Sequence, residues 1–144
     1  MSISARPYRE EEQDYPWDEA LCEHAVMYGQ LEVLKWAREH GCPWDEDTRE
    51  CIRAALYGHL HVVEWLVALG ADLNFARADD GATPVSCAAQ SGHVHVVGWL
   101  VDAGADMNQA RTDDGATPLS MATHMGHLDV VKRLIDAGAD IGSG

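Results

Sequence analysis

The chain has 144 residues, of which 47% are hydrophobic and 24% charged, and it carries a formal net charge of −14. This composition is typical of one globular domain and excludes a disordered chain, and no apolar run reaches the roughly 18 residues of a membrane helix. Because an acidic surface repels phosphate groups, we expect neither nucleic acid nor an anionic membrane as a partner.

The two ends of the chain differ from its middle. The first 15 residues contain clustered charges and no apolar stretch, which indicates a flexible segment rather than a secretory signal. Residues 142–144, Gly-Ser-Gly, resemble a linker or a tag scar. Residues 16–141 are therefore expected to form one folded domain.

Four similar segments follow one another along this domain, each lying between two glycines. A segment of this length makes about two and a half helical turns, and apolar residues recur at helical spacing, as at Leu60, Val63, Leu66 and Val67. Glycine ends a helix well because it readily adopts the left-handed backbone conformation. The pattern predicts helices over residues 30–40, 59–69, 93–103 and 127–137.

A second helix is expected before each of these segments. Thr83-Pro84 and Thr117-Pro118 begin two of these helices, because threonine caps free amide groups and proline fits the first helical position. Asp18 and Asp45 are the expected caps of the corresponding helices in the first two repeats. Small residues at matching positions let neighbouring helices approach closely. They are Ala25, Ala54, Ala55, Ala88, Ala89 and Ala122.

With these elements in place, the sequence resembles the ankyrin repeat. The resemblance rests on the segments Asp80–Ala89 and Asp114–Ala122 and on the Gly-His and Gly-Ala-Asp steps after them, and it covers roughly residues 16–141. It implies an all-α solenoid of stacked helix–turn–helix units. The four repeats are expected at about 16–42, 43–70, 71–104 and 105–141, with hairpin-like fingers at about 71–82 and 105–116.

Two departures from the family pattern affect the turns. The family's histidine after Thr-Pro is replaced by Ser86 in the third repeat and by Ser120 in the fourth. We therefore expect the anchor that this histidine supplies to be weaker or replaced. The segment Gly41–Asp45 is too short for a finger, and it predicts a tight turn between the first two repeats.

Histidines and paired carboxylates could suggest a metal site, but the sequence favours structural roles. His59 and His61 are two residues apart, as are His93 and His95, so the members of each pair point in different directions on a helix. The histidine of each Gly-His step is expected to tie down a loop. The Asp-Asp pairs of the fingers lack the ligand series of a calcium loop and predict solvated tips. We expect no metal, no cofactor and no enzymatic activity.

The four cysteines form no Cys-X-X-Cys pair, which predicts reduced thiols in an intracellular, cytoplasmic protein. Cys22 and Cys51 stand seven residues before their glycines, where Val85 and Leu119 stand in the later repeats. A cysteine that aligns with valine and leucine is expected to be a small buried apolar group rather than a nucleophile.

The tryptophans recur at fixed positions. Trp36, Trp65 and Trp99 share one place in the second helix of their repeats, where the last repeat has Arg133. The resemblance puts them on the convex side, either in the packing between neighbouring helices or in a hydrophobic patch for a partner. Trp17 and Trp44 recur in Pro-Trp-Asp-Glu and are expected to cover the ends of helix pairs.

The resemblance implies binding of a protein partner on the concave face, which the first helices and the finger tips form. We expect a monomer whose partner offers an apolar or basic segment, with Tyr28 and Tyr57 as anchors. The alternative for these residues is ordinary surface. The expected contact residues are Met27, Tyr28, Leu56, Tyr57, Gln90, Ser91, His124 and Met125 in the helices, and Phe75, Arg77, Asp79, Asp80, Ala82, Arg111, Asp113, Asp114 and Ala116 in the fingers.

Other functions stay open on the sequence alone. The chain could be a structural fragment of a longer solenoid with no partner of its own, or an engineered or repurposed binder. Asn74 and Asn108 end a leucine, acidic, apolar, asparagine pattern that resembles the target of an ankyrin-directed asparaginyl hydroxylase. The alternative is that these asparagines close a turn by bonding backbone groups.

Overall fold

The computed structural model describes residues 19–42 and 47–139, and within them it contains eight α-helices and no strand. The helices are α1 (Glu19–Met27), α2 (Leu31–Glu39), α3 (Asp47–Tyr57), α4 (Leu60–Ala68), α5 (Pro84–Ser91), α6 (Val94–Asp102), α7 (Pro118–Met125) and α8 (Leu128–Asp136). The expected caps Asp18 and Asp45, the tryptophans Trp17 and Trp44 and the tail 142–144 lie outside the described residues.

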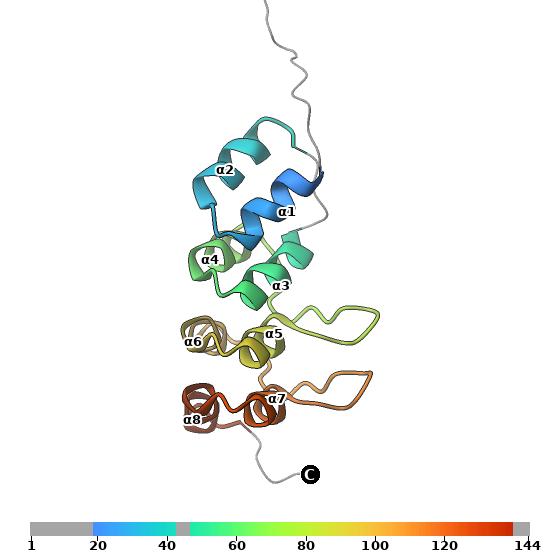
Figure 1. The fold of residues 1–144 in the computed structure, drawn as a ribbon, viewed down its shortest axis with the longest axis vertical. Coiled ribbons are helices and arrows are strands. Elements are labelled where there is room, and N and C mark those ends of the chain that lie inside the picture. Colours follow the sequence, from blue (N-terminus) through green and yellow to red (C-terminus); the bar gives the residue numbers. More distant parts are fainter. Residues whose placement is uncertain (1–18, 43–46, 140–144) are drawn as a thin grey trace, which may run out of the picture.

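The helices form four antiparallel pairs stacked in one column (Figure 1). The odd-numbered helices line one side of the column and are called the inner helices here; the even-numbered helices line the other side. Two loops, between α4 and α5 and between α6 and α7, project from the side of the inner helices (Figure 1). The all-helical solenoid and its two fingers are thus confirmed.

The inner helices α5 and α7 begin with a cap that explains the missing family histidine. Thr83 Oγ1 accepts a hydrogen bond from the Ser86 amide at 3.2 Å, and Ser86 Oγ accepts one from the Thr83 amide at 2.8 Å. Thr117 and Ser120 repeat this arrangement with the same distances. The serine therefore replaces the histidine anchor by completing a reciprocal capping box.

The core lies between the two helices of each pair and between successive pairs. Ala54, Ala55, Ala88 and Ala122 are fully buried in it, as expected for small residues between closely packed helices. Cys51 is buried at the place that Val85 fills one repeat later, so its thiol acts as an apolar filler.

The histidine of each Gly-His step joins two repeats rather than closing a loop of its own. Nε2–H of His59 donates to the carbonyl oxygen of Met27 at 2.6 Å. The same bond joins His93 to Leu56 and His127 to Gln90, both at 3.0 Å. Each ring lies over the glycine that ends the preceding inner helix, leaving no room there for a Cβ atom.

The recurring tryptophans of the outer, even-numbered helices differ in how far they are buried. Trp65 and Trp99 are half-buried against the main core. Arg133 takes their place in α8, where it donates to the Gly98 carbonyl and pairs with Asp102 at 2.7 Å. Trp36 is exposed and stacks on His40.

Two glycine-to-alanine variants can separate the effect of the histidine–glycine contact on stability from the effect of backbone strain. Gly58 (φ +81°) and Gly70 (φ +108°) are both left-handed, but a Cβ atom on Gly58 would lie 2.5 Å from the His93 ring, whereas Gly70 has open space. Gly70→Ala should cost about 1–2 kcal/mol through strain. Gly58→Ala should lower the free energy of unfolding by about 1–3 kcal/mol more, because the ring must move.

Urea unfolding of both variants measures this difference. In a His93→Ala background the extra cost of Gly58→Ala should disappear, which a double-mutant cycle tests. Equal costs for Gly58→Ala and Gly70→Ala would contradict the contact.

The thiol of Cys51 predicts a loss of stability at alkaline pH. Burial raises the pKa of this thiol from about 9 to about 12. Because the unfolded chain ionises first, the contribution is intact below pH 9 and is lost as the pH rises, by about 1.4 kcal/mol for each unit above 9. Urea titrations with a reductant should show that the parent loses more stability than Cys51→Val between pH 8 and 10.5. Parallel pH profiles would refute this origin.

Candidate functional site

The two fingers are hairpin loops whose backbones bond to themselves and to each other. In the first finger the Arg77 amide donates to the Ala82 carbonyl at 3.0 Å, and in the second the Arg111 amide donates to Ala116 at 2.8 Å. The Thr112 amide donates to the Asp80 carbonyl at 3.0 Å, which links the second finger to the first. The fingers are therefore one connected unit.

A chain of ion pairs holds the same unit together. Asp80 Oδ2 lies 2.8 Å from Arg77 Nη2 and 3.1 Å from Arg111 Nη2, and Asp80 Oδ1 accepts from the Ala82 amide at 3.0 Å. Arg111 also pairs with Asp113 at 3.1 Å. The Arg77 guanidinium, with help from that backbone amide and from Arg111, holds the pKa of the Asp80 carboxyl below its usual 3.8.

The expectation of solvated tips therefore holds for some carboxylates and not for Asp80. The Asp79 side chain is 83% exposed, and Asp113 and Asp114 also face solvent. Asp80 is only 19% exposed because two arginines cover it. Ala82, another expected contact residue, is fully buried and cannot contact a partner.

Asn74 and Asn108 lie in the short segments that connect α4 and α6 to the hairpins of the fingers. Asn74 Oδ1 accepts from the Asp106 amide at 2.6 Å, which bridges the two connections, while the Asn74 amide bonds to Asp72. The Asn108 amide bonds to Asp106 in the same way. The side chain of Asn74 thus has a structural role, and hydroxylation of either residue stays a prediction.

One pocket lies between the second finger and α7, with a volume of about 730 Å³. It brings together predicted contact residues from three elements, and three further lining residues were not predicted from the sequence: Gly115, Ser120 and Met121. The predicted residues in its wall are Gln90, Arg111, Asp114, Ala116, His124 and Met125.

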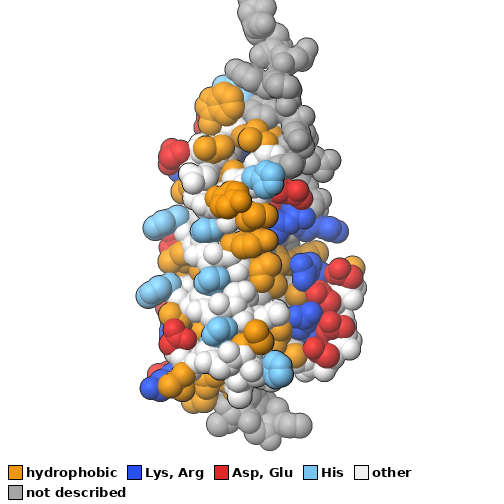
Figure 2. All heavy atoms as spheres, viewed as in Figure 1, with side chains coloured by type: hydrophobic (Ala, Val, Ile, Leu, Met, Phe, Trp, Pro, Cys, Tyr) orange, Lys and Arg blue, Asp and Glu red, His pale blue; other side chains and the backbone are white. Residues whose placement is uncertain are grey.

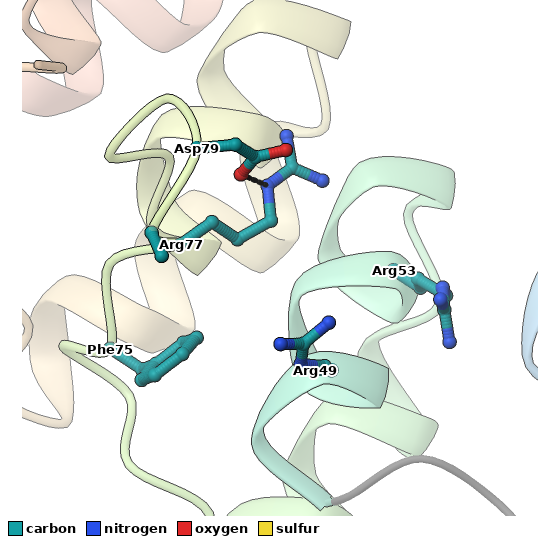
Figure 3. A pocket seen from close by; sticks show the side chains of 6 residues that line it. Arg49, Arg53, Phe75, Arg77 and Asp79 are labelled. Carbon is teal, nitrogen blue, oxygen red and sulfur yellow. Dashed lines mark ion pairs between the residues drawn. The ribbon is translucent and has the colours of Figure 1, made fainter.

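A second pocket, the arginine pocket, lies between α3 and the first finger and has a volume of about 430 Å³. Its lining is Arg49, Arg53, Phe75, Arg77, Ala78 and Asp79. Figure 3 shows the guanidinium of Arg49 between Phe75 and Arg53, with the Arg77–Asp79 pair on the finger side. Arg49 and Arg53 are missing from the sequence-based set, although their spacing of one helical turn on an inner helix could have indicated them.

Exposed apolar side chains gather at the ends of the inner helices. Tyr28 is 66% exposed and Tyr57 41%, and Met125 is exposed at the end of α7. Leu56 and Phe75 are half-buried and pack against a small cluster under the first finger. Figure 2 shows hydrophobic side chains over the inner helices beside the charged fingers. Met27, Gln90 and Ser91 are half-buried.

The described residues offer little for chemistry. Among residues 19–42 and 47–139, no three His, Cys, Asp or Glu side chains lie together as metal ligands would. No helix in this part of the chain is both long and apolar enough to span a bilayer. The thiols of Cys22, Cys51 and Cys87 are buried, and burial raises the pKa of each, which suppresses the thiolate form needed for nucleophilic attack.

Two family models match the sequence, and both describe ankyrin repeats. A model of three copies matches residues 51–144, and a model of many copies matches residues 22–67. A comparison with curated proteins finds no match. The two matched ranges together run from residue 22, within α1, through α2 to α8.

The two adjacent aspartates of the first finger should differ in their effect on stability. Asp80→Ala removes hydrogen bonds to two arginines and one amide and should lower the free energy of unfolding by about 1–2 kcal/mol, allowing for partial exposure. Asp79→Ala, the matched control, should cost less than about 0.5 kcal/mol. Urea unfolding at pH 7 measures both.

The pH dependence gives a second check on Asp80. Because its folded pKa lies below the unfolded 3.8, its contribution is present above that pH and is lost as the pH falls through the folded value. The difference between the parent and Asp80→Ala should therefore shrink in strong acid. A difference that stays constant down to pH 2 would argue against the ion pairs as its source.

Proposed function

Because the chain belongs to the ankyrin-repeat family, whose members are generally non-catalytic protein–protein interaction modules, we propose that it binds a protein partner on its concave face. This face consists of the inner helices and the two fingers. The observation that carries the proposal is the exposure of Tyr28 and Tyr57 at equivalent places in successive repeats. Neither side chain is needed in the core, since Ser91 and Met125 stand at the same place later.

The proposed face is ordered before a partner arrives. The first finger is fixed by Asp80 and by the Asn74 bond to the second connection. A rigid surface with exposed tyrosine and methionine binds well, because little side-chain freedom is lost on contact. The protein is thus proposed to act as a binding module without catalysis, metal or cofactor.

The charges indicate how a partner would approach. Asp79, Asp113 and Asp114 project toward solvent from the finger tips, whereas the tyrosines form an apolar ledge beside α1 and α3. A partner with an apolar segment for the ledge and basic residues opposite the tips fits this arrangement. Charges at a rim mainly raise the association rate, and a buried aromatic anchor lowers the dissociation rate.

Peptides selected from a random library displayed on phage, with the immobilised full chain as target, provide a probe for this face. Tyr57→Ala should weaken their binding by about 2 kcal/mol, or roughly 30-fold, mainly through a faster dissociation rate in surface plasmon resonance. Asp79→Asn combined with Asp113→Asn should lower the association rate of basic peptides and reduce its salt dependence.

The control is Trp36→Ala, which removes an exposed aromatic side chain from the convex side. Binding that survives Tyr57→Ala but is lost with Trp36→Ala would move the site to the convex face. A library that yields no binder would favour a purely structural segment.

A further inference from the structure

The arginine pocket brings several arginines together in the lining of one pocket of an acidic protein. The chain has 10 Lys and Arg residues against 24 Asp and Glu residues. Three of these 10, Arg49, Arg53 and Arg77, line one pocket, together with a single carboxylate, Asp79. Arg49 and Arg53 lie on α3, the helix that also carries the exposed Tyr57 and the half-buried Leu56.

The repeat itself does not require arginines at these positions, although Arg53 also pairs with the buried Glu50. Thr83 and Cys87 hold the equivalent places one repeat later, and Thr117 and Met121 hold them two repeats later. Both Cys87 and Met121 are buried there, so the solenoid accepts an uncharged side chain at the place of Arg53. Of the second, third and fourth repeats, only the second therefore has arginines at these two positions.

Neighbouring carboxylates hold the guanidinium groups of Arg53 and Arg77 in place. Arg53 Nη1 donates to the buried Glu50 at 3.0 Å, and Arg53 Nη2 lies 3.4 Å from Glu23. Arg77 donates through Nε and Nη2 to Asp80. Because a guanidinium carries five N–H donors, the two bonds of Arg77 to Asp80 orient that group and use only part of its donors.

We propose that the arginine pocket binds the carboxylate of a Glu or Asp side chain in an extended segment of the partner protein. This inference rests on the proposed function, whose concave face contains the pocket. Its volume of about 430 Å³ is within the range of small-ligand sites, and Phe75 offers an apolar wall for the methylene groups of the side chain. Arg–carboxylate pairs are frequently bidentate, which gives both strength and orientation.

The net charge of −14 does not prevent this contact. At physiological salt the Debye length is about 8 Å, so acidic groups farther away are largely screened while a contact pair inside a pocket is not. Asp79 at the rim disfavours a second anionic group close to the first. A single acidic residue within an otherwise apolar or basic segment is therefore the fitting ligand.

The probes are peptides selected by phage display on the full chain. Each is synthesised in an acidic form, with the selected sequence, and in an amidated form, in which Gln replaces Glu and Asn replaces Asp. The parent protein should bind the acidic form about tenfold more tightly in fluorescence polarisation. Arg49→Gln should remove most of that preference, because it removes a positive charge from the pocket lining. The fold should be little affected, since Arg49 is exposed and the Arg53–Glu50 pair remains in place. The matched control is Arg38→Gln on α2, which removes the same charge outside the pocket.

A second measurement does not depend on any variant. On addition of the acidic peptide, NMR signals of guanidinium Nε–H groups lining the pocket should shift in the parent protein, and the amidated peptide should leave them in place. Inorganic phosphate, added at millimolar concentration as a competitor, should displace the acidic peptide only weakly.

The outcomes separate this inference from the proposed function. Peptides that need Tyr57 but bind equally well in the acidic and amidated forms would overturn the carboxylate site and keep the concave face. Strong displacement by phosphate, with no preference for acidic peptides, would also overturn it, in favour of a phosphorylated ligand. Binding that is insensitive to both Tyr57→Ala and Arg49→Gln would remove the proposed function as well.

Discussion

The hydrogen bond from each Gly-His histidine to the preceding repeat is the contact on which the rest of the structure depends. A ring such as that of His93 reaches the carbonyl at the end of one inner helix and lies over the glycine that follows it. The bond satisfies a carbonyl that the helix end leaves open, and the missing Cβ lets the repeats approach. This spacing sets the distance between α3, α5 and α7, and the fingers and pockets follow from it.

Much of the fold could be predicted because its signals are local in the sequence. Glycines such as Gly58 end helices through their own backbone conformation, and Thr83-Pro84 begins α5 through a cap within four residues. Burial of the alanines also follows from their place in the period. The capping role of Ser86 was harder to predict, because the family pattern has histidine there and serine makes a different, reciprocal pair of bonds.

The candidate site depends on contacts that a sequence does not display. Asp79 and Asp80 are identical neighbours, yet one faces solvent and the other is covered by Arg111 from the next finger, 31 residues away. The predicted contact residues on the inner helices are the two that precede each glycine, and Arg49 and Arg53 lie one to two turns earlier on α3. Only once the first finger is placed beside α3 do these arginines and Phe75 line one pocket.

The sharing of one carboxylate between two repeats has a thermodynamic consequence. Because Asp80 bonds to Arg77 in its own finger and to Arg111 in the next, the loops lose their conformational freedom on folding rather than on association. The loops are already ordered when a ligand binds, so binding loses little further conformational entropy. A small contact area can then give specific binding. Association should accordingly show a heat-capacity change that reflects the buried apolar area alone, without the larger change that accompanies coupled folding.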